Sequence, residues 1–181
     1  ILISDYAKGT LSNTQELIKI AKKNKKLIFI DPKGDDFSKY KGATLIKPNL
    51  KEFETIVGQC LDQKDLIKKE KKLIKQIQIE YLLITQGSNG MTLISKNNEV
   101  LHENTRAKEV YDVTGAGDTV IATLTAAISH GYKIKQAMNF SNMAASCVVQ
   151  KLGAATVTPK ELQAKINANT PIKMGILSRK E

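Results

Sequence analysis

The stretch from Asp112 to Asp118, Asp-Val-Thr-Gly-Ala-Gly-Asp, combines residue types that could move a phosphoryl group. Its two glycines allow a tight turn and a close approach of the backbone to a ligand. A long apolar run begins at Thr119, so the turn should open a helix whose free N–H groups favour an anion such as phosphate. Asp118 would lie on the first helical turn, where a carboxylate could take a proton from an attacking hydroxyl. The alternative is a purely structural turn capped by Asp118, because short glycine motifs are common.

Asp112 is the other carboxylate of this stretch. We favour Asp118 as the base because it follows the glycines and faces the anion site. For Asp112 we expect a bracing role in the loop, or a contact with a cation or the substrate. His102 and His130 show no partner pattern, and no Gly-x-x-x-x-Gly-Lys-Ser/Thr phosphate loop occurs in the chain.

Apolar runs and turn residues predict the elements that must position these groups. Strands are expected at Ile1–Ile3 (short and buried), Leu27–Ile30, Thr44–Ile46, Tyr81–Thr85 and Glu109–Tyr111, the last within a β-like run from Ala107 to Tyr111, with a hairpin formed by Met91–Ser95 and Val100–His102. Helices are expected from a capping box at Ser12 and Gln15 to Lys23, from Asn49 to Val57, from Asp62 to Ile77, over 117–129 and 134–150, and from Thr158-Pro159 onward. Gly131 and Gly153 stand past the two long helices, where left-handed C-caps are expected. Alternating strands and helices predict an α/β domain with a largely parallel sheet.

The polar motifs all follow expected strands. Asp5, Asp31, Asn49, Gly87 and Asp112 each come after a predicted strand. In open α/β sheets, ligands bind at the carboxyl ends of the strands. We therefore expect these motifs to face one site.

Four motifs together resemble a known family. They are Ser4 to Gly9, Asp31 to Gly34, Lys47 to Phe53, and Val110 to Val120. The glycine motif resembles the second signature of the ribokinase-like (PfkB) carbohydrate kinases, and the four in order resemble the bacterial heptose-7-phosphate kinase branch, in many bacteria the first domain of a bifunctional ADP-heptose synthase. The likeness runs from Ile1 to about Ser178. It implies a three-layer ribokinase-like domain that lacks its N-terminal part and lid, with 1–170 as its C-terminal nucleotide-binding part and 171–181 as a tail or linker.

The resemblance also implies roles for single residues. Asp118 would be the base, and the backbone N–H groups of Gly115, Ala116 and Gly117 would stabilise the transferring phosphoryl group of ATP. Asn49 and Glu52 would hold Mg²⁺ through water, as suits a hard cation. Further nucleotide contacts are implied at Leu50, Lys51, Thr85, Gly87, Gly90 and Asn142, and substrate contacts at Asp5, Lys8, Lys33 and Asp112. Structural alternatives remain open for each: a capping box at Asn49 and Glu52, a plain turn at Gly87, and solvated surface lysines.

Composition limits the partners. The net charge is +10, but 26 of the 28 basic residues are lysine, whereas arginine is favoured for base contacts. The composition therefore favours no nucleic acid as a partner, and no membrane is expected, since no run of 18 apolar residues occurs. The resemblance implies ATP and a sugar phosphate as the partners. Two widely spaced cysteines, Cys60 and Cys147, favour free thiols in a reducing cytoplasm, and the resemblance implies that this cytoplasm is bacterial. By the same resemblance the full-length protein is expected to be a homodimer. The alternatives are a ribokinase-like kinase for another sugar or nucleoside, and a non-catalytic basic binding module.

Overall fold

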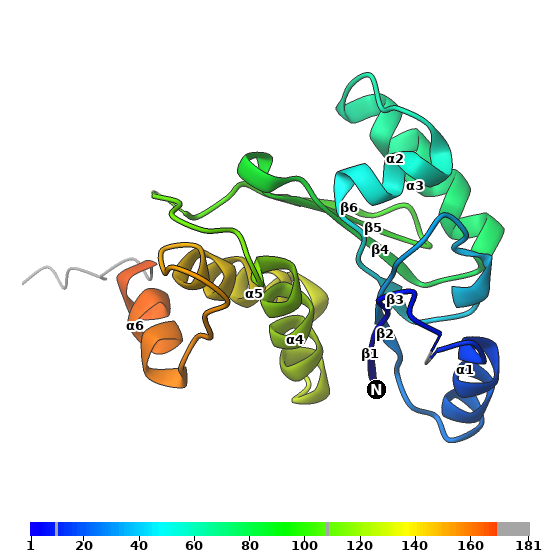
Figure 1. Ribbon diagram of the computed structural model, residues 1–181, viewed down its shortest axis with the longest axis horizontal. Coiled ribbons are helices and arrows are strands. Elements are labelled where there is room, and N and C mark those ends of the chain that lie inside the picture. Colours follow the sequence, from blue (N-terminus) through cyan, green and yellow to red (C-terminus); the bar gives the residue numbers. More distant parts are fainter. Residues whose placement is uncertain (10, 108, 170–181) are drawn as a thin grey trace, which may run out of the picture.

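A six-stranded sheet forms the centre of the computed structural model, which describes residues 1–9, 11–107 and 109–169 (Figure 1). The strands are β1 (Leu2–Ser4), β2 (Phe29–Asp31), β3 (Leu45–Ile46), β4 (Tyr81–Thr85), β5 (Met91–Ser95) and β6 (Val100–Glu103), in that spatial order. β1 to β4 pair in parallel, and β5 and β6 continue the sheet as an antiparallel hairpin. The predicted α/β class and the largely parallel sheet are confirmed.

Helices cover both faces of the sheet, which gives three layers. α1 (Thr14–Lys23), α2 (Leu50–Val57) and α3 (Gln63–Ile77) pack with Ile30, Ile46 and Leu82. α4 (Ala116–Ser129) and α5 (Ile134–Val148) pack with Phe29, Leu45 and Leu83 on the other face. The separation follows from the strands, because neighbouring residues point to opposite faces. α6 (Pro159–Asn169) lies against α5 (Figure 1). Two short 3₁₀ turns connect strands: η1 (Ser38–Tyr40) lies between β2 and β3, and η2 (Gly87–Asn89) lies between β4 and β5.

The expected helix starts are mostly confirmed. Asn49 and Glu52 form a reciprocal capping box on α2, Asp62 caps α3, and Thr158 and Glu161 exchange hydrogen bonds at the start of α6. The capping box predicted at Ser12 and Gln15 is wrong. Asn13 precedes α1, and the Gln15 amide instead donates to the Lys39 and Lys41 carbonyls, both at 3.0 Å. The Gln15 side chain thus bonds to a distant loop and not to the start of its own helix.

The strand predicted at Glu109–Tyr111 is also wrong, as is the β-like run from Ala107. Among the described residues of this run there is no ladder partner, and the Tyr111 N–H donates to the Val149 carbonyl after α5 at 2.8 Å. Val110 and Tyr111 are largely exposed. The segment is therefore an irregular connection, and Asp112 does not follow a strand.

Two further expectations need correction. β1 is only half buried, because Ile3 faces the core while Ile1 and Leu2 are exposed. Gly131 follows the end of α4 with a φ of 87°, as predicted, but Gly153 lies beyond the end of α5, which stops at Val148. None of the described helices has the length and apolar character needed to cross a membrane. The tail predicted for 171–181 lies outside the described residues.

Candidate functional site

A cavity of about 760 Å³ opens where the parallel strands end and α4 begins. Asp5 follows β1, Asp31 ends β2, Asn49 follows β3 and Thr85 ends β4. All four line the cavity, together with Asp118 from the first turn of α4. α4 reaches this edge because it lies against β1 and β2 and buries Val120, Ile121 and Leu124 against the sheet. The motifs therefore converge on one site as expected. Four of them come from strand ends, and the fifth comes from the start of α4 and not from the end of a strand.

The two glycines before Asp118 serve different purposes. Gly115 has a φ of 77°, a left-handed conformation that suits glycine, and it makes the turn into α4. Gly117 has no such φ, but a Cβ there would come within 3.3 Å of the Lys47 ammonium. The Ala116 N–H donates to Val113 at 3.1 Å, whereas no backbone acceptor within the described chain takes the N–H of Gly115, Gly117 or Asp118. The turn therefore leaves donors for an anion at the start of a helix.

The two carboxylates of this stretch differ in their surroundings. The Asp112 Oδ1 accepts from the N–H and hydroxyl of Thr114 at 2.8 and 2.7 Å, and its Oδ2 accepts from the Gly153 N–H at 2.9 Å. The Thr114 hydroxyl and the two backbone donors lower the pKa of Asp112. Asp118 lines the cavity, and no hydrogen bond or ion pair from the described residues holds its carboxylate. Asp112 can brace the turn, while Asp118 is available to a ligand.

Glu52 joins the start of α2 to the loop after β2. Its Oε2 accepts from the Asn49 N–H at 3.0 Å, and the Asn49 Oδ1 accepts from the Glu52 N–H at 2.9 Å. The other Glu52 oxygen, Oε1, pairs with the Lys33 ammonium at 2.7 Å, and this hydrogen bond raises the pKa of Lys33. The side chain of Lys33 is 52% exposed, so the pair is open to solvent and can be exchanged for another cation.

The Asn49 and Glu52 oxygens could hold Mg²⁺ through water molecules, but they could not enclose it. Within the described residues no cluster of three or more His, Cys, Asp or Glu could enclose a metal ion. Mg²⁺ in phosphoryl-transfer sites usually keeps several waters and is held by one or two carboxylates and the substrate phosphates. The Asn49 and Glu52 oxygens can supply that kind of water-mediated hold, but not a complete cage.

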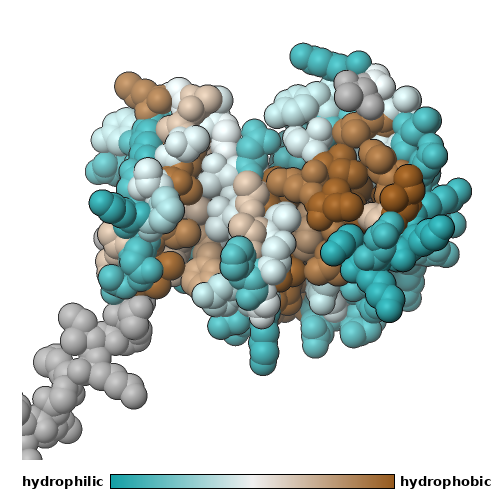
Figure 2. Space-filling model, turned by 90° about the horizontal axis from the view of Figure 1, so that it is seen from below, coloured by the Kyte–Doolittle hydropathy of each residue, from teal (hydrophilic) through white to brown (hydrophobic). Residues whose placement is uncertain are grey.

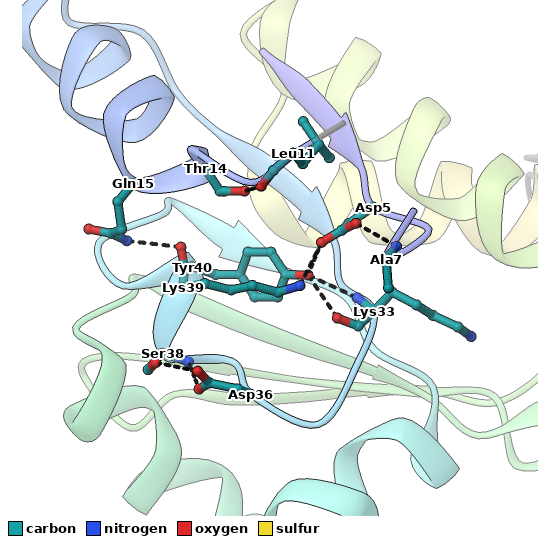
Figure 3. Close-up of polar contacts among 10 residues, drawn as sticks. All are labelled: Asp5, Ala7, Leu11, Thr14, Gln15, Lys33, Asp36, Ser38, Lys39 and Tyr40. Carbon is teal, nitrogen blue, oxygen red and sulfur yellow. Dashed lines mark hydrogen bonds and ion pairs between the residues drawn. The ribbon is translucent and has the colours of Figure 1, made fainter. Parts of the chain in front are cut away.

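Asp5 is the centre of a buried network on the β1 side of the cavity (Figure 3). Its Oδ2 accepts from the Tyr40 hydroxyl at 2.6 Å and from Lys39 at 2.8 Å, and its Oδ1 accepts from the Ala7 N–H at 2.7 Å. Burial alone would raise the pKa of Asp5, but these hydrogen bonds hold it below its usual value. Burial and the Asp5 carboxylate raise the pKa of Tyr40 to about 12. The network fixes the loops after β1 and β2, because the Tyr40 hydroxyl also accepts from the Lys33 N–H at 3.0 Å.

The candidate nucleotide-side residues lie toward β4 and α5. The amide of Asn142, a buried residue on α5, donates to the Asn104 carbonyl at 2.7 Å. Gly87 begins η2 and Gly90 follows it, and a Cβ at Gly90 would overlap the Glu103 carbonyl oxygen. Together with Thr85 they line the cavity, so this wall joins three separate parts of the chain.

The cavity does not gather every predicted site residue. Asn49, Glu52, Thr85, Gly87, Gly90, Asn142, Asp5, Lys33, Ala116, Gly117 and Asp118 line it, whereas Lys8, Leu50, Lys51, Asp112 and Gly115 do not. Lys47 and Asp31 belong to the four motifs, and Asp31 is expected to face the site, but neither has a predicted chemical role. Both line the cavity, and Lys47 is buried with its ammonium 3.0 Å from the Asp31 Oδ1. The signal that could have found Lys47 is a lysine directly after an apolar strand, where solvent exposure is not expected.

Burial raises the pKa of Asp31, Lys47 acts against that rise, and the nearby Asp118 and Glu52 add to it. The carboxylates of Asp31 at the end of β2, Glu52 on α2 and Asp118 on α4 are therefore close enough to affect one another's charge. A sheet with helices on both faces, an anion-binding turn, an exposed carboxylate and a nearby cation together fit the class of phosphoryl-transfer enzymes, and the sequence has no P-loop.

Comparison with known proteins gives the family. The description pfkB family carbohydrate kinase matches residues 7–161, and the chain belongs to this family. It is 45% identical over 181 residues to the bifunctional protein HldE of Klebsiella pneumoniae (strain 342), and 52% identical over 169 residues to that of Hydrogenovibrio crunogenus. The alignments cover 100% and 93% of this chain but only 38% and 35% of those relatives.

Solved structures confirm the fold. The Arabidopsis thaliana ribokinase complexed with ribose and ATP matches with a TM-score of 0.78 at 23% identity, over 84% of this chain and 51% of that one. Phosphofructokinase-2 from Escherichia coli matches with a TM-score of 0.80 at 18% identity, over 92% of this chain and 56% of that one. The ribokinase-like fold expected from the motifs is therefore present, and the chain spans about half of each matched structure.

Proposed function

We propose that this chain supplies the nucleotide-binding side of a kinase that transfers the γ-phosphoryl group of ATP to a sugar phosphate. The proposed acceptor is D-glycero-β-D-manno-heptose 7-phosphate at its 1-hydroxyl, which would give the 1,7-bisphosphate for ADP-heptose and lipopolysaccharide core biosynthesis in the bacterial cytoplasm. The observation that carries the proposal is the Asp118 carboxylate, which lines the cavity beside the anion-binding turn and has no hydrogen-bond or ion-pair partner in the described chain. The sugar-kinase family and the HldE relatives support the acceptor class.

The residues have distinct parts in the proposed reaction. Asp118 accepts the proton of the acceptor hydroxyl as its oxygen attacks the γ-phosphorus. The free N–H groups of Gly115 and Gly117, at the positive end of α4, stabilise charge on the transferring phosphoryl group. Asp112 keeps the turn in place through Thr114 and Gly153. Most of the rate enhancement in such a transfer comes from positioning and electrostatics, which this arrangement can provide.

The remaining assignments concern ATP and its cation. Asn49 and Glu52 would hold Mg²⁺ through water, and a bound Mg²⁺ would neutralise phosphate charge. Leu50 and Lys51 on α2, Thr85, Gly87 and Gly90 by β4, and Asn142 on α5 are proposed to border the nucleotide. Lys33 and Lys8 are proposed to meet phosphate oxygens as point charges, with Asp5 and Asp112 on the acceptor side.

The proposal is tested with the intact natural protein that contains this chain. Asp118→Asn should lower turnover with heptose 7-phosphate by about 10²-fold or more, because a general base contributes on that scale. Binding of ATP, measured by calorimetry, should be largely kept. Glu99→Gln is the matched control, since Glu99 is an exposed carboxylate in the β5–β6 turn away from the cavity. Near-normal heptose phosphorylation by Asp118→Asn would remove Asp118 from this role.

A panel of acceptors with labelled ATP separates the alternatives. Transfer to another sugar or to a nucleoside, with none to heptose 7-phosphate, would assign a different ribokinase-like kinase. No ATP affinity together with salt-dependent binding to duplex DNA would support a basic binding module.

A further inference from the structure

Lys47 is a buried cation at the floor of the cavity. It follows β3, is 3% exposed and lines the cavity with its neighbours Asp31 and Asn49. Lysine is rarely buried unless it is paired, and here the Asp31 Oδ1 lies 3.0 Å from its Nζ. A lysine ammonium has three donors. In the part of the chain that the structure describes, Asp31 is the one ion-pair partner recorded for it, so donors remain for a ligand.

The ammonium also lies against the anion-binding turn. A Cβ built on Gly117 would be 3.3 Å from the Lys47 Nζ, while the backbone of Gly117 has no positive φ that would itself require glycine. Glycine at position 117 thus leaves the Lys47 ammonium its place, because any larger residue would bring a Cβ into tight contact with it. Gly117 and Lys47 also line the same cavity.

Three carboxylates that line the cavity are paired with lysines, and these lysines differ in their exposure to solvent. Glu52 is paired with Lys33, whose side chain is 52% exposed, and Asp5 with Lys39, whose side chain is 34% exposed. The Lys47 side chain is 4% exposed, so its charge is the least screened of the three. Lys47 therefore offers a buried positive charge to a phosphoryl group placed between the turn and Asp118, in addition to the more exposed Lys33.

We propose that Lys47, held by Asp31 and given room by Gly117, contacts the transferred phosphoryl group and stabilises its charge during transfer. The inference rests on the proposed kinase function. In the transfer, the bond between the γ-phosphorus and the oxygen bridging to the β-phosphate breaks and ADP leaves. A bond from the acceptor oxygen to that phosphorus forms, and the hydroxyl proton passes to Asp118. Lys47 gives up no proton and acts as a fixed positive charge.

The experiment uses the intact natural protein and three variants. Lys47→Met removes the charge and keeps the length of the side chain. Lys47→Met with Asp31→Asn removes both charges, so that no unpaired carboxylate stays buried. Lys64→Met, at an exposed lysine of α3, is the control. We expect turnover to fall by about 10²- to 10³-fold in both Lys47 variants, the scale of a lost electrostatic stabiliser, with the KM for ATP changed less than tenfold.

A second measurement does not depend on turnover. Aluminium fluoride added to ADP and Mg²⁺ mimics the transferred phosphoryl group, and its binding is followed as an extra rise in melting temperature over ADP alone. The wild type and Lys64→Met should show this rise, and both Lys47 variants should lose it while keeping the rise due to ADP. Circular dichroism of each variant establishes that it is folded.

The outcomes separate this inference from the kinase proposal. If the wild type phosphorylates no acceptor and shows no aluminium fluoride effect, the proposed function fails and this inference fails with it. If the wild type is active and the double variant regains turnover to within a few fold, Lys47 only neutralises Asp31 and the inference alone is overturned. Slow turnover in both Lys47 variants with the aluminium fluoride effect lost supports it.

Discussion

At the scale of single residues, the cavity pairs most of its carboxylates with lysines. Asp5 is paired with Lys39, Glu52 with Lys33 and Asp31 with Lys47. Asp118 has no such partner among the described residues. A paired carboxylate is a poor base, because the cation stabilises its charged form. The pairing therefore singles out Asp118 more sharply than its position in the glycine motif does.

A carboxyl group outside the cavity lining is buried without a hydrogen-bond partner in the described structure. Glu70 of α3 is fully buried among the apolar residues that face the sheet, such as Leu66, Leu73 and Ile77. Neither of its carboxylate oxygens has a hydrogen-bond partner in the described structure. Burial raises the pKa of Glu70 to about 9, so the side chain is a neutral acid at neutral pH.

This burial predicts a pH dependence of stability. Because the pKa of Glu70 is raised on folding, the folded state binds more protons than the unfolded state between the ordinary value of 4.5 and about 9. The free energy of unfolding should therefore fall as the pH rises through that window, by at most about 1.4 kcal/mol per pH unit from this residue. Glu70→Gln should remove this slope, and the exposed Glu16→Gln should keep it. Urea denaturation at several pH values measures it, and equal slopes in wild type and Glu70→Gln would contradict it.

At the scale of elements, the capping motifs of the sequence predicted the helix starts correctly where both hydrogen-bond partners lie within one helical turn. The caps at Asn49, Asp62 and Thr158 use residues three positions apart, so the sequence contains the whole interaction. The signal at Ser12 and Gln15 has the same spacing and failed, because Gln15 found acceptors on the distant loop around Lys39. A capping motif predicts a cap only when no tertiary partner competes for its side chains.

The connection between β4 and β5 gives a prediction at this scale. Gly90 has a φ of 78°, and a Cβ there would overlap the Glu103 carbonyl at the end of β6, whereas Gly87 has a φ of 59° and open space. Alanine at Gly87 should lower the free energy of unfolding by about 1 kcal/mol, the strain of a left-handed residue. Alanine at Gly90 should cost that amount and about 1–3 kcal/mol more for overpacking. Urea denaturation of the two variants compares them, and losses of equal size would show that the Glu103 contact can relax.

At the scale of the whole molecule, the sequence predicted where the site lies better than what it contains. Each strand end could be found separately, and the rule that ligands bind at such ends brought the motifs together. The contact between Lys47 and Gly117 joins the end of β3 to the start of α4, and no periodicity links those positions. The segment before Asp112 was mistaken for a strand because Val110 and Tyr111 are β-forming residues, although they are exposed and have no ladder partner in the described chain.

The outer side of β1 gives a prediction about the molecule as a whole. β1 pairs only with β2 among the described strands, and the nearby Ile1, Leu2 and Leu27 are 55%, 40% and 46% exposed. Ile1 and Leu27 are neighbours, because the Ile1 amino group donates to the Leu27 carbonyl at 2.8 Å. Two more apolar side chains of α1, Leu17 and Ile20, are also exposed. The space-filling view from below shows an apolar area on one side of the molecule (Figure 2).

An open strand edge beside exposed apolar side chains favours self-association. We therefore expect the 181-residue chain on its own to associate as its concentration rises, measured by sedimentation velocity. Leu27→Lys should weaken this association about tenfold or more, the effect of one apolar side chain that is no longer buried. Leu61→Lys is the control, because Leu61 is 85% exposed and lies before α3.

The net charge of +10 makes the copies repel each other, so added salt should strengthen apolar association by screening. Association that weakens with salt would instead point to contacts between opposite charges.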